Sequence, residues 1–96
     1  MLALAALFEK LRGVRRALAD ARNLPAYVIF SDVALREMAR SYPTTPAEFR
    51  RIPGVGEQKL KDFAEPFLFA IADYLQSNPR QSFARLTNYV RAQRRS

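Results

Sequence analysis

The sequence predicts an all-α protein, a small orthogonal bundle of about five helices with a basic helical extension at its C-terminal end. Apolar residues recur at three- and four-residue steps along most of the 96 residues, which is the period of helices with one buried face. Only one segment has strand-like composition, and a lone strand has no partner for its backbone hydrogen bonds. Hydrophobic residues make up 49% of the chain and charged residues 26%, so one globular domain with one modest core is expected.

The first predicted helix covers residues 2–22. One apolar stripe runs along it, formed by Leu4, Leu7, Phe8, Leu11, Val14 and Leu18. Pro25 disfavours helical backbone in the residue before it, so the helix ends near residues 23–25. Residues 26–30, AYVIF, are the strand-like segment, and we predict that they form an apolar connector packed into the helical core.

Two further helices are predicted from capping signals. One begins with Ser31 or Asp32 as its N-cap and ends at residues 42–43, Tyr-Pro. Residues 45–48, Thr-Pro-Ala-Glu, form a capping box with proline at the first helical position, so a short helix begins there. It ends at residues 53–54, Pro-Gly.

A longer helical period extends from about residue 57 to about residue 77, with Pro66 inside it. Proline deletes one backbone hydrogen bond, so it should kink this helix or split it in two. A weak amphipathic pattern beyond the Asn-Pro break at 78–79 predicts a final basic helix. We therefore divide the chain into a domain, 1–79, and an extension, 80–96. The predicted core includes Val28, Ile29, Leu35, Met38, Phe49, Ile52, Val55, Leu60, Phe67 and Ile71.

The composition excludes most catalytic chemistry. The chain has no Cys, His or Trp, which removes thiol nucleophiles, thiolate metal sites and the usual general base. Its nine acidic residues form no pair at a spacing suited to acid–base catalysis. We therefore predict a non-enzymatic protein without metal or cofactor. No run of 18 apolar residues exists, so no membrane partner is expected, and the lack of Cys fits a reducing cytoplasm.

The charge indicates an anionic partner. The net charge is +7, and nucleic acid is the first candidate for such a basic chain. The charge is unevenly distributed, because residues 80–96 contain five Arg and no acid whereas residues 1–79 carry only +2. The near-neutral body keeps a second interpretation open, a domain that docks on another protein.

Three stretches of sequence carry a family resemblance. In order they are LFEKLRGVRRALAD, NLPAYVIFSDVALREMA and PTTPAEFRRIPGVGEQKLKDFAEPFLFAI. In this order and spacing they resemble the HRDC domain, the helicase-and-ribonuclease-D C-terminal domain, over about residues 7–77. The similarity is greatest to domains of bacterial RecQ helicases. It implies a helical auxiliary module that binds single-stranded or partly duplex DNA weakly and adjusts which substrates a helicase engages.

Tyr27 is the aromatic candidate for nucleic-acid binding. It follows Pro25 in the connector, where an exposed ring could stack on an unpaired base. The resemblance implies the same role, because an aromatic residue at this position lies on the nucleic-acid-binding face of RecQ-type members. The alternative is that Tyr27 belongs to the core together with residues 28–30.

Basic residues on the predicted helices supply the candidate phosphate contacts. Those selected are Arg16, Arg22, Arg36, Arg40, Lys59 and Lys61. Two of them also have a structural alternative: Arg16 suits a solvated helix face, and Arg22 suits the negative end of the helix dipole. Arg15 falls along the apolar stripe, so we predict that it is partly buried, paired with a carboxylate and structural.

The turn at residues 54–56, Gly-Val-Gly, also allows two interpretations. With Lys59 and Lys61 it resembles a helix-hairpin-helix, in which backbone N–H groups approach a phosphate. It is equally the pattern of a tight turn between helices whose Val55 fills the core.

The leading functional hypothesis is an auxiliary nucleic-acid-binding module of a RecQ-like DNA helicase. Single-stranded or partly duplex DNA is the expected partner, with RNA as a further possibility, and the domain is expected to act as a monomer in the bacterial cytoplasm at the nucleoid. The alternatives are a domain that docks on a helicase core or another protein, and an accessory domain of a ribonuclease D-like nuclease.

Overall fold

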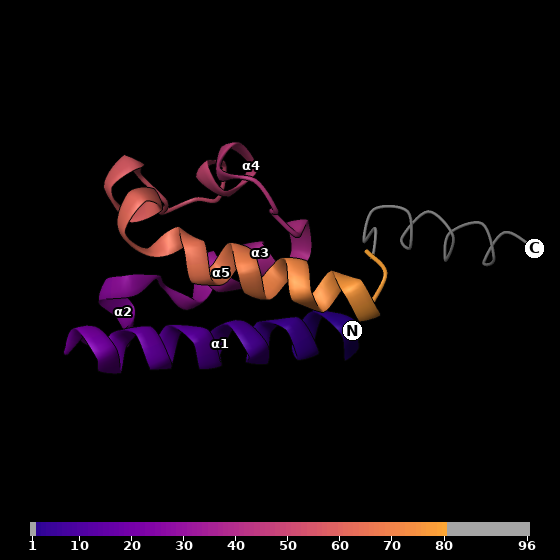
Figure 1. Cartoon of the computed structure of the whole chain (residues 1–96), viewed down its shortest axis with the longest axis horizontal. Coiled ribbons are helices and arrows are strands. Elements are labelled where there is room, and N and C mark those ends of the chain that lie inside the picture. Colours follow the sequence, from indigo (N-terminus) through magenta and orange to yellow (C-terminus); the bar gives the residue numbers. More distant parts are fainter. Residues whose placement is uncertain (1, 81–96) are drawn as a thin grey trace, which may run out of the picture.

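The computed structural model of the chain describes residues 2–80, which form five helices and no strand (Figure 1). The helices are α1 (Leu2–Arg22), α2 (Ala26–Ile29), α3 (Asp32–Ser41), α4 (Pro46–Arg50) and α5 (Glu57–Ser77). The all-α prediction is confirmed. The final basic helix predicted within 80–96 lies outside the described residues, apart from Arg80.

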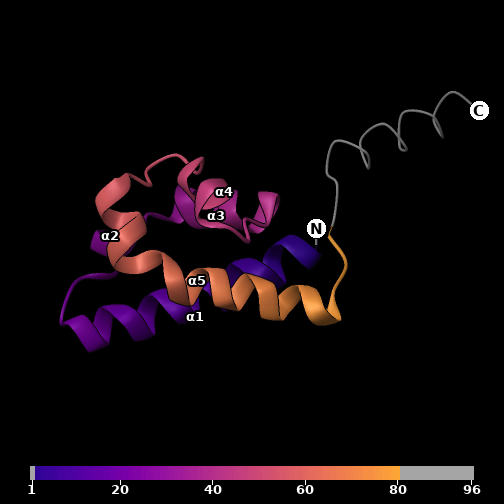
Figure 2. The ribbon, with the colours of Figure 1, turned by 45° about the horizontal axis from the view of Figure 1, so that its top comes forward.

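The two long helices, α1 and α5, run side by side in opposite directions, as Figures 1 and 2 show from two sides. An ion pair of 2.7 Å between Lys10 Nζ and Asp73 Oδ2 joins the N-terminal half of α1 to the C-terminal half of α5. α3 packs against α1, and α4 packs against α5. The core therefore lies between the long helices and the short ones.

Within the segment AYVIF, Ala26–Ile29 form one turn of helix, α2, and the predicted packing of this connector into the core is confirmed for Ile29 and Phe30. α1 ends in a residue with left-handed backbone, Asn23 at φ 56°, and the Leu24 N–H donates to Ala19 O at 2.9 Å. This is the hydrogen bond of a Schellman cap, and Pro25 then prevents the helix from continuing. The chain turns back along α1, so that α2 packs against it.

Side-chain N-caps start α3 and α4, as the sequence predicts. Ser31 Oγ accepts a hydrogen bond of 3.1 Å from the Ala34 N–H, and Thr45 Oγ1 accepts one of 3.2 Å from the Glu48 N–H. The Glu48 carboxylate reaches back one residue beyond the cap, where the Thr44 N–H donates to it at 2.9 Å. This backbone hydrogen bond is the main cause that holds the pKa of Glu48 below its ordinary value.

α5 continues through Pro66 as one helix, so of the two outcomes predicted for this proline, a kink or a split, the split does not occur. Figures 1 and 2 show that α5 changes direction in its N-terminal half, which agrees with the predicted kink. Pro66 has no N–H, so the Asp62 carbonyl lacks its helical partner. Arg22 replaces that partner, because its Nη2 donates to Asp62 O at 3.1 Å.

Phe30 lies at the centre of an aromatic cluster in the core. Its ring packs edge-on against Phe49, Phe63 and Phe67, with centroid distances of 5.6, 6.2 and 5.0 Å. Such edge-to-face pairs stabilise a core beyond the area they bury. Val28 and Leu60 are half-buried, and the other eight residues of the predicted core are buried.

Candidate nucleic-acid interface

Tyr27 is exposed on the outer side of α2, with 74% of its surface accessible. The alternative that placed Tyr27 in the core is therefore wrong. Tyr27 faces outward from the single turn of α2, whereas the side chains of Ile29 and Phe30 are buried in the core. The ring is free to stack on a planar ligand.

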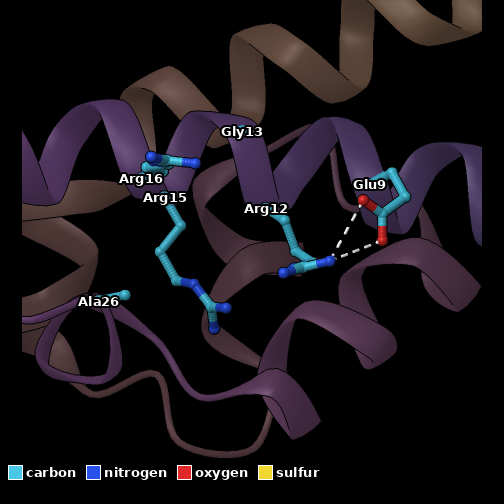
Figure 3. Close-up of a pocket in the computed structure, with 6 residues that line it drawn as sticks. All are labelled: Glu9, Arg12, Gly13, Arg15, Arg16 and Ala26. Carbon is cyan, nitrogen blue, oxygen red and sulfur yellow. Dashed lines mark hydrogen bonds and ion pairs between the residues drawn. The ribbon is translucent and has the colours of Figure 1, made fainter.

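A pocket of about 450 Å3 lies between α1 and the start of α2, where Ala26 is one of its lining residues. We call it the α1–α2 pocket, and it is lined by Glu9, Arg12, Gly13, Arg15, Arg16 and Ala26 (Figure 3). Three of these six residues are arginines, whereas only one is acidic. Ala26 directly precedes Tyr27 in α2, so the pocket and the exposed ring belong to consecutive residues of this helical turn.

The three arginines of the pocket are held differently. Arg15 is only 11% exposed in its side chain, donates from Nη1 to Phe30 O at 2.9 Å and pairs from Nη2 with Asp32 Oδ1 at 2.8 Å. The predicted structural role of Arg15 is confirmed. Arg12 turns back to the Glu9 carboxylate at 2.9 Å (Figure 3). Arg16 is exposed and makes no hydrogen bond or ion pair within the described part of the chain.

Positive charge predominates around the α1–α2 pocket, which three arginines and one glutamate line. The pKa of Asp32 lies below its ordinary value, first because Arg15 donates a hydrogen bond to it and then because of the Arg15 charge. Arg36 and Arg12 lower it further by their charges. Arg36 on α3 is therefore close enough to join the field around the α1–α2 pocket.

The α3 arginines lie along one face of that helix. The Arg36 guanidinium stacks over the Phe8 ring of α1, with its carbon 5.5 Å from the ring centroid. Arg40 is exposed one turn further along α3. These two residues extend the positive side toward the C-terminal end of α3.

The other three predicted cations lie elsewhere, on or against α5. Arg22 stacks over the Phe63 ring at 5.4 Å in addition to binding the Asp62 carbonyl. The Lys59 Nζ lies 6.0 Å from the centre of the Phe30 ring, and Lys61 is exposed. The structure thus brings Arg16 and the Tyr27 segment together, while Arg22 is occupied by contacts within the fold.

The turn at 54–56 has the left-handed backbone at Gly54 that a tight turn with glycine predicts. Gly54 adopts φ +89°, a backbone conformation that favours glycine, and Val55 is buried in the core. Arg50 Nη1 donates to Val55 O at 3.4 Å. The packing of Val55 fits the interpretation of a tight turn between helices.

Phe69 is a surface residue that the sequence prediction missed. The other two phenylalanines of α5, Phe63 and Phe67, are buried, whereas Phe69 is 76% exposed. It lines a groove of about 640 Å3 with Leu18, Arg22, Lys61, Asp62, Glu65 and Pro66. Helical geometry could have revealed it, because a residue two positions after buried Phe67 points to the other side of the helix.

The family comparison agrees with the all-α fold. The HRDC domain model matches residues 5–71, which is most of the chain. The chain belongs to the HRDC family. The match includes residues 9–26 and therefore every residue that lines the α1–α2 pocket.

Relatives of this HRDC domain are DNA helicases. The chain is 47% identical over 68 residues to the ATP-dependent DNA helicase RecQ of Pasteurella multocida and 39% identical over 82 residues to that of Bacillus subtilis. It is 37% identical over 62 residues to the ATP-dependent DNA helicase UvrD2 of Mycobacterium bovis. These matches cover 71%, 85% and 65% of the chain but only 11%, 12% and 9% of the relatives. HRDC is thus an accessory domain in much longer helicases.

Two further features of the described residues bear on the chemistry of this HRDC domain. Residues 2–80 contain no cluster of three or more His, Cys, Asp or Glu side chains that could hold a metal ion. No helix in the same range is long and apolar enough to cross a membrane.

Proposed function

We propose that this HRDC domain is the weak DNA-binding module of a RecQ-like helicase and contacts single-stranded or partly duplex DNA. In this role it would act in the bacterial cytoplasm at the nucleoid. The observation that carries the proposal is the exposed ring of Tyr27, which directly follows a residue of a pocket that three arginines line. An aromatic face next to basic side chains is the arrangement that single-strand binding uses.

Each part of this surface has a defined role in the proposal. An unpaired base stacks on Tyr27, which contributes about 1–3 kcal/mol. Arg16 and Arg36 attract the neighbouring phosphates, and Arg40 continues this path along α3. In duplex DNA the bases are paired and cannot stack on the ring, so single-stranded segments bind better.

The small net charge of the body explains why binding is weak. Residues 1–79 carry only +2, so few phosphates are neutralised and few counterions are released. The extension at 80–96 carries +5 and would add nonspecific affinity. Arg80 is already bound to the body, because its Nη1 donates to Tyr42 O at 3.1 Å.

A salt series with single-stranded DNA tests the proposal. We expect the affinity of the full chain for a fluorescent oligothymidylate to fall as salt rises. Tyr27→Ala should weaken binding about 5- to 150-fold at unchanged melting temperature, and Tyr27→Phe, which keeps the ring, should bind like the wild type. Binding that is independent of salt, or absent at high micromolar protein, would refute the proposal.

A second candidate function is docking on a helicase core or another protein. The groove around Phe69 favours it, because a largely exposed aromatic ring beside Pro66 and Leu18 is typical of a protein-binding anchor. Phe69→Ser separates the two functions. It should leave oligothymidylate binding intact, and it should abolish docking on a helicase core if that is the role of the groove.

A further inference from the structure

Gly13 lies in the middle of α1, where glycine is unfavourable because it loses more conformational freedom than alanine on folding. It is the only glycine inside a helix of the described residues. No packing contact requires it, since an added Cβ would meet no atom within 4 Å outside the local helix backbone. The fold itself therefore gives no steric reason for glycine at this position.

The reason lies instead in the space of the α1–α2 pocket, which a side chain at position 13 would reduce. Gly13 forms part of its lining together with Arg12, Arg16 and Ala26 (Figure 3). Without a side chain at position 13, the helix backbone itself forms this part of the lining. A side chain there would project into space that the structure leaves open.

We propose that the α1–α2 pocket binds one phosphodiester group of a DNA strand whose adjacent base stacks on Tyr27. The missing side chain of Gly13 lets the phosphate approach the helix between Arg12 and Arg16. This assignment rests on the proposed DNA binding and adds to it the position of a phosphate and the role of a glycine. Arg16 is the first contact, because it has no competing partner in the described residues.

Arg12 joins the site by exchanging partners. Its ion pair with Glu9 is exposed on both sides, with side-chain exposures of 51% and 63%, and exposed pairs of this kind are weak. A phosphate carries two acceptor oxygens in the geometry that a guanidinium prefers. It therefore takes Arg12 over from the Glu9 carboxylate, while Arg15 stays bound to Phe30 O and Asp32.

Substitutions at position 13 give opposite changes in stability and binding. Gly13→Ala should raise the melting temperature, because alanine is the better helix former, and should lower the affinity for oligothymidylate. Gly13→Leu should weaken binding about tenfold or more, which corresponds to the loss of one charge-assisted contact. Ala6→Leu adds the same side chain to an exposed position of α1 outside the pocket and should change binding less than about twofold.

Glu9 provides an independent test with the opposite sign. Glu9→Gln removes the carboxylate that competes for Arg12 and should strengthen oligothymidylate binding. Glu65→Gln makes the same change of charge at an exposed residue that does not line the pocket, and its gain should be smaller. Equal gains from the two variants would overturn the proposed exchange of partners.

An NMR titration of the unmodified chain separates failure of this inference from failure of the proposed function. With added oligothymidylate we expect shifts of the Gly13 and Ala26 amides and of the Arg12 and Arg16 Nε–H groups, together with the Tyr27 ring. Shifts at Tyr27 without shifts at the pocket, or a Gly13→Leu variant that binds like wild type, overturn the phosphate site alone. A titration with no shifts anywhere overturns the proposed DNA binding and this site with it.

Discussion

Tyr27 and Phe30 lie three residues apart in one apolar segment, yet one ring is largely exposed and the other is completely buried. Composition does not distinguish them, because both are aromatic residues of AYVIF. The difference arises from backbone geometry. Tyr27 lies in the single turn of α2, whereas Phe30 follows it in extended backbone at φ −151° and ψ 149°. A short helix followed by an extended residue thus separates a binding residue from a core residue.

Arg15 fixes this arrangement from α1. Its guanidinium binds the carbonyl of Phe30 and the carboxylate of Asp32, so it holds both ends of the link between α2 and α3. One side chain therefore supports the buried ring and the beginning of the next helix.

Phe30→Ala should have the largest effect on stability. It removes the ring at the centre of three edge-to-face contacts and leaves a cavity, so the free energy of unfolding should fall by about 3–5 kcal/mol. Tyr27→Ala should change it by no more than about 0.5 kcal/mol, because the ring is on the surface. Urea unfolding of both variants measures the contrast. Similar losses would show that Tyr27 also supports the core.

Arg15→Met should have the next largest effect. Methionine keeps much of the packing but leaves the Phe30 carbonyl without its donor, which should cost about 1–3 kcal/mol. Arg16→Met is the matched control on the same helix and should stay within about 0.5 kcal/mol. The same urea measurement distinguishes them. If Arg16→Met were the more destabilising variant, the division into structural and free arginines would be wrong.

Much of the fold could be predicted from local signals. The Ser31 and Thr45 caps, the end of α1 before Pro25 and the apolar face of α3 follow from sequence patterns that act over a few residues. The one-turn helix α2 could not be predicted, because four residues give no measurable helical period. Its apolar composition fits strand, connector and helix equally well.

The candidate interface was only partly predictable for a related reason. Sequence pattern places Arg16 and Arg22 on one basic helix, but tertiary contacts decide which of them is free. Arg22 is occupied because Pro66, 44 positions away, leaves a carbonyl without a donor next to it. Similarly, the role proposed for Gly13 depends on a pocket that Ala26 also lines, and the chain brings Ala26 there only after turning back along α1.

The Asp62 carbonyl is a second backbone acceptor that an arginine satisfies, because Pro66 has no N–H to donate to it. Arg22→Ala should cost about 0.5–1.5 kcal/mol in the wild-type background, because the Asp62 carbonyl loses its donor. With Pro66→Ala, the new N–H bonds Asp62 O within the helix, and the cost of Arg22→Ala should shrink. A double-mutant cycle measures this coupling. Additive effects would mean that the contact at 3.1 Å does not compensate for the proline.

The smallest expected effect is a pH dependence at the link between α2 and α3. The pKa of Asp32 in the folded protein lies below its ordinary value of 3.8, chiefly because of the hydrogen bond from Arg15. A carboxyl group whose folded pKa is lowered stabilises the fold when ionised, so its contribution is present above the ordinary value. It is lost as the pH falls through the lowered pKa.

Asp32→Asn removes this contribution while keeping a similar shape. Its melting temperature should lie slightly below that of the wild type near neutral pH, and the difference should disappear as the pH falls well below 3.8. Glu48 also weakens the fold in acid, because its pKa is lowered too, but it is present in both proteins and cancels in the difference. In an Arg15→Met background, Asp32→Asn should show no such pH-dependent difference, because the hydrogen bond and charge that lower the pKa are gone. A difference that persists in that background would assign the effect to the charge of Asp32 at the start of α3 rather than to Arg15.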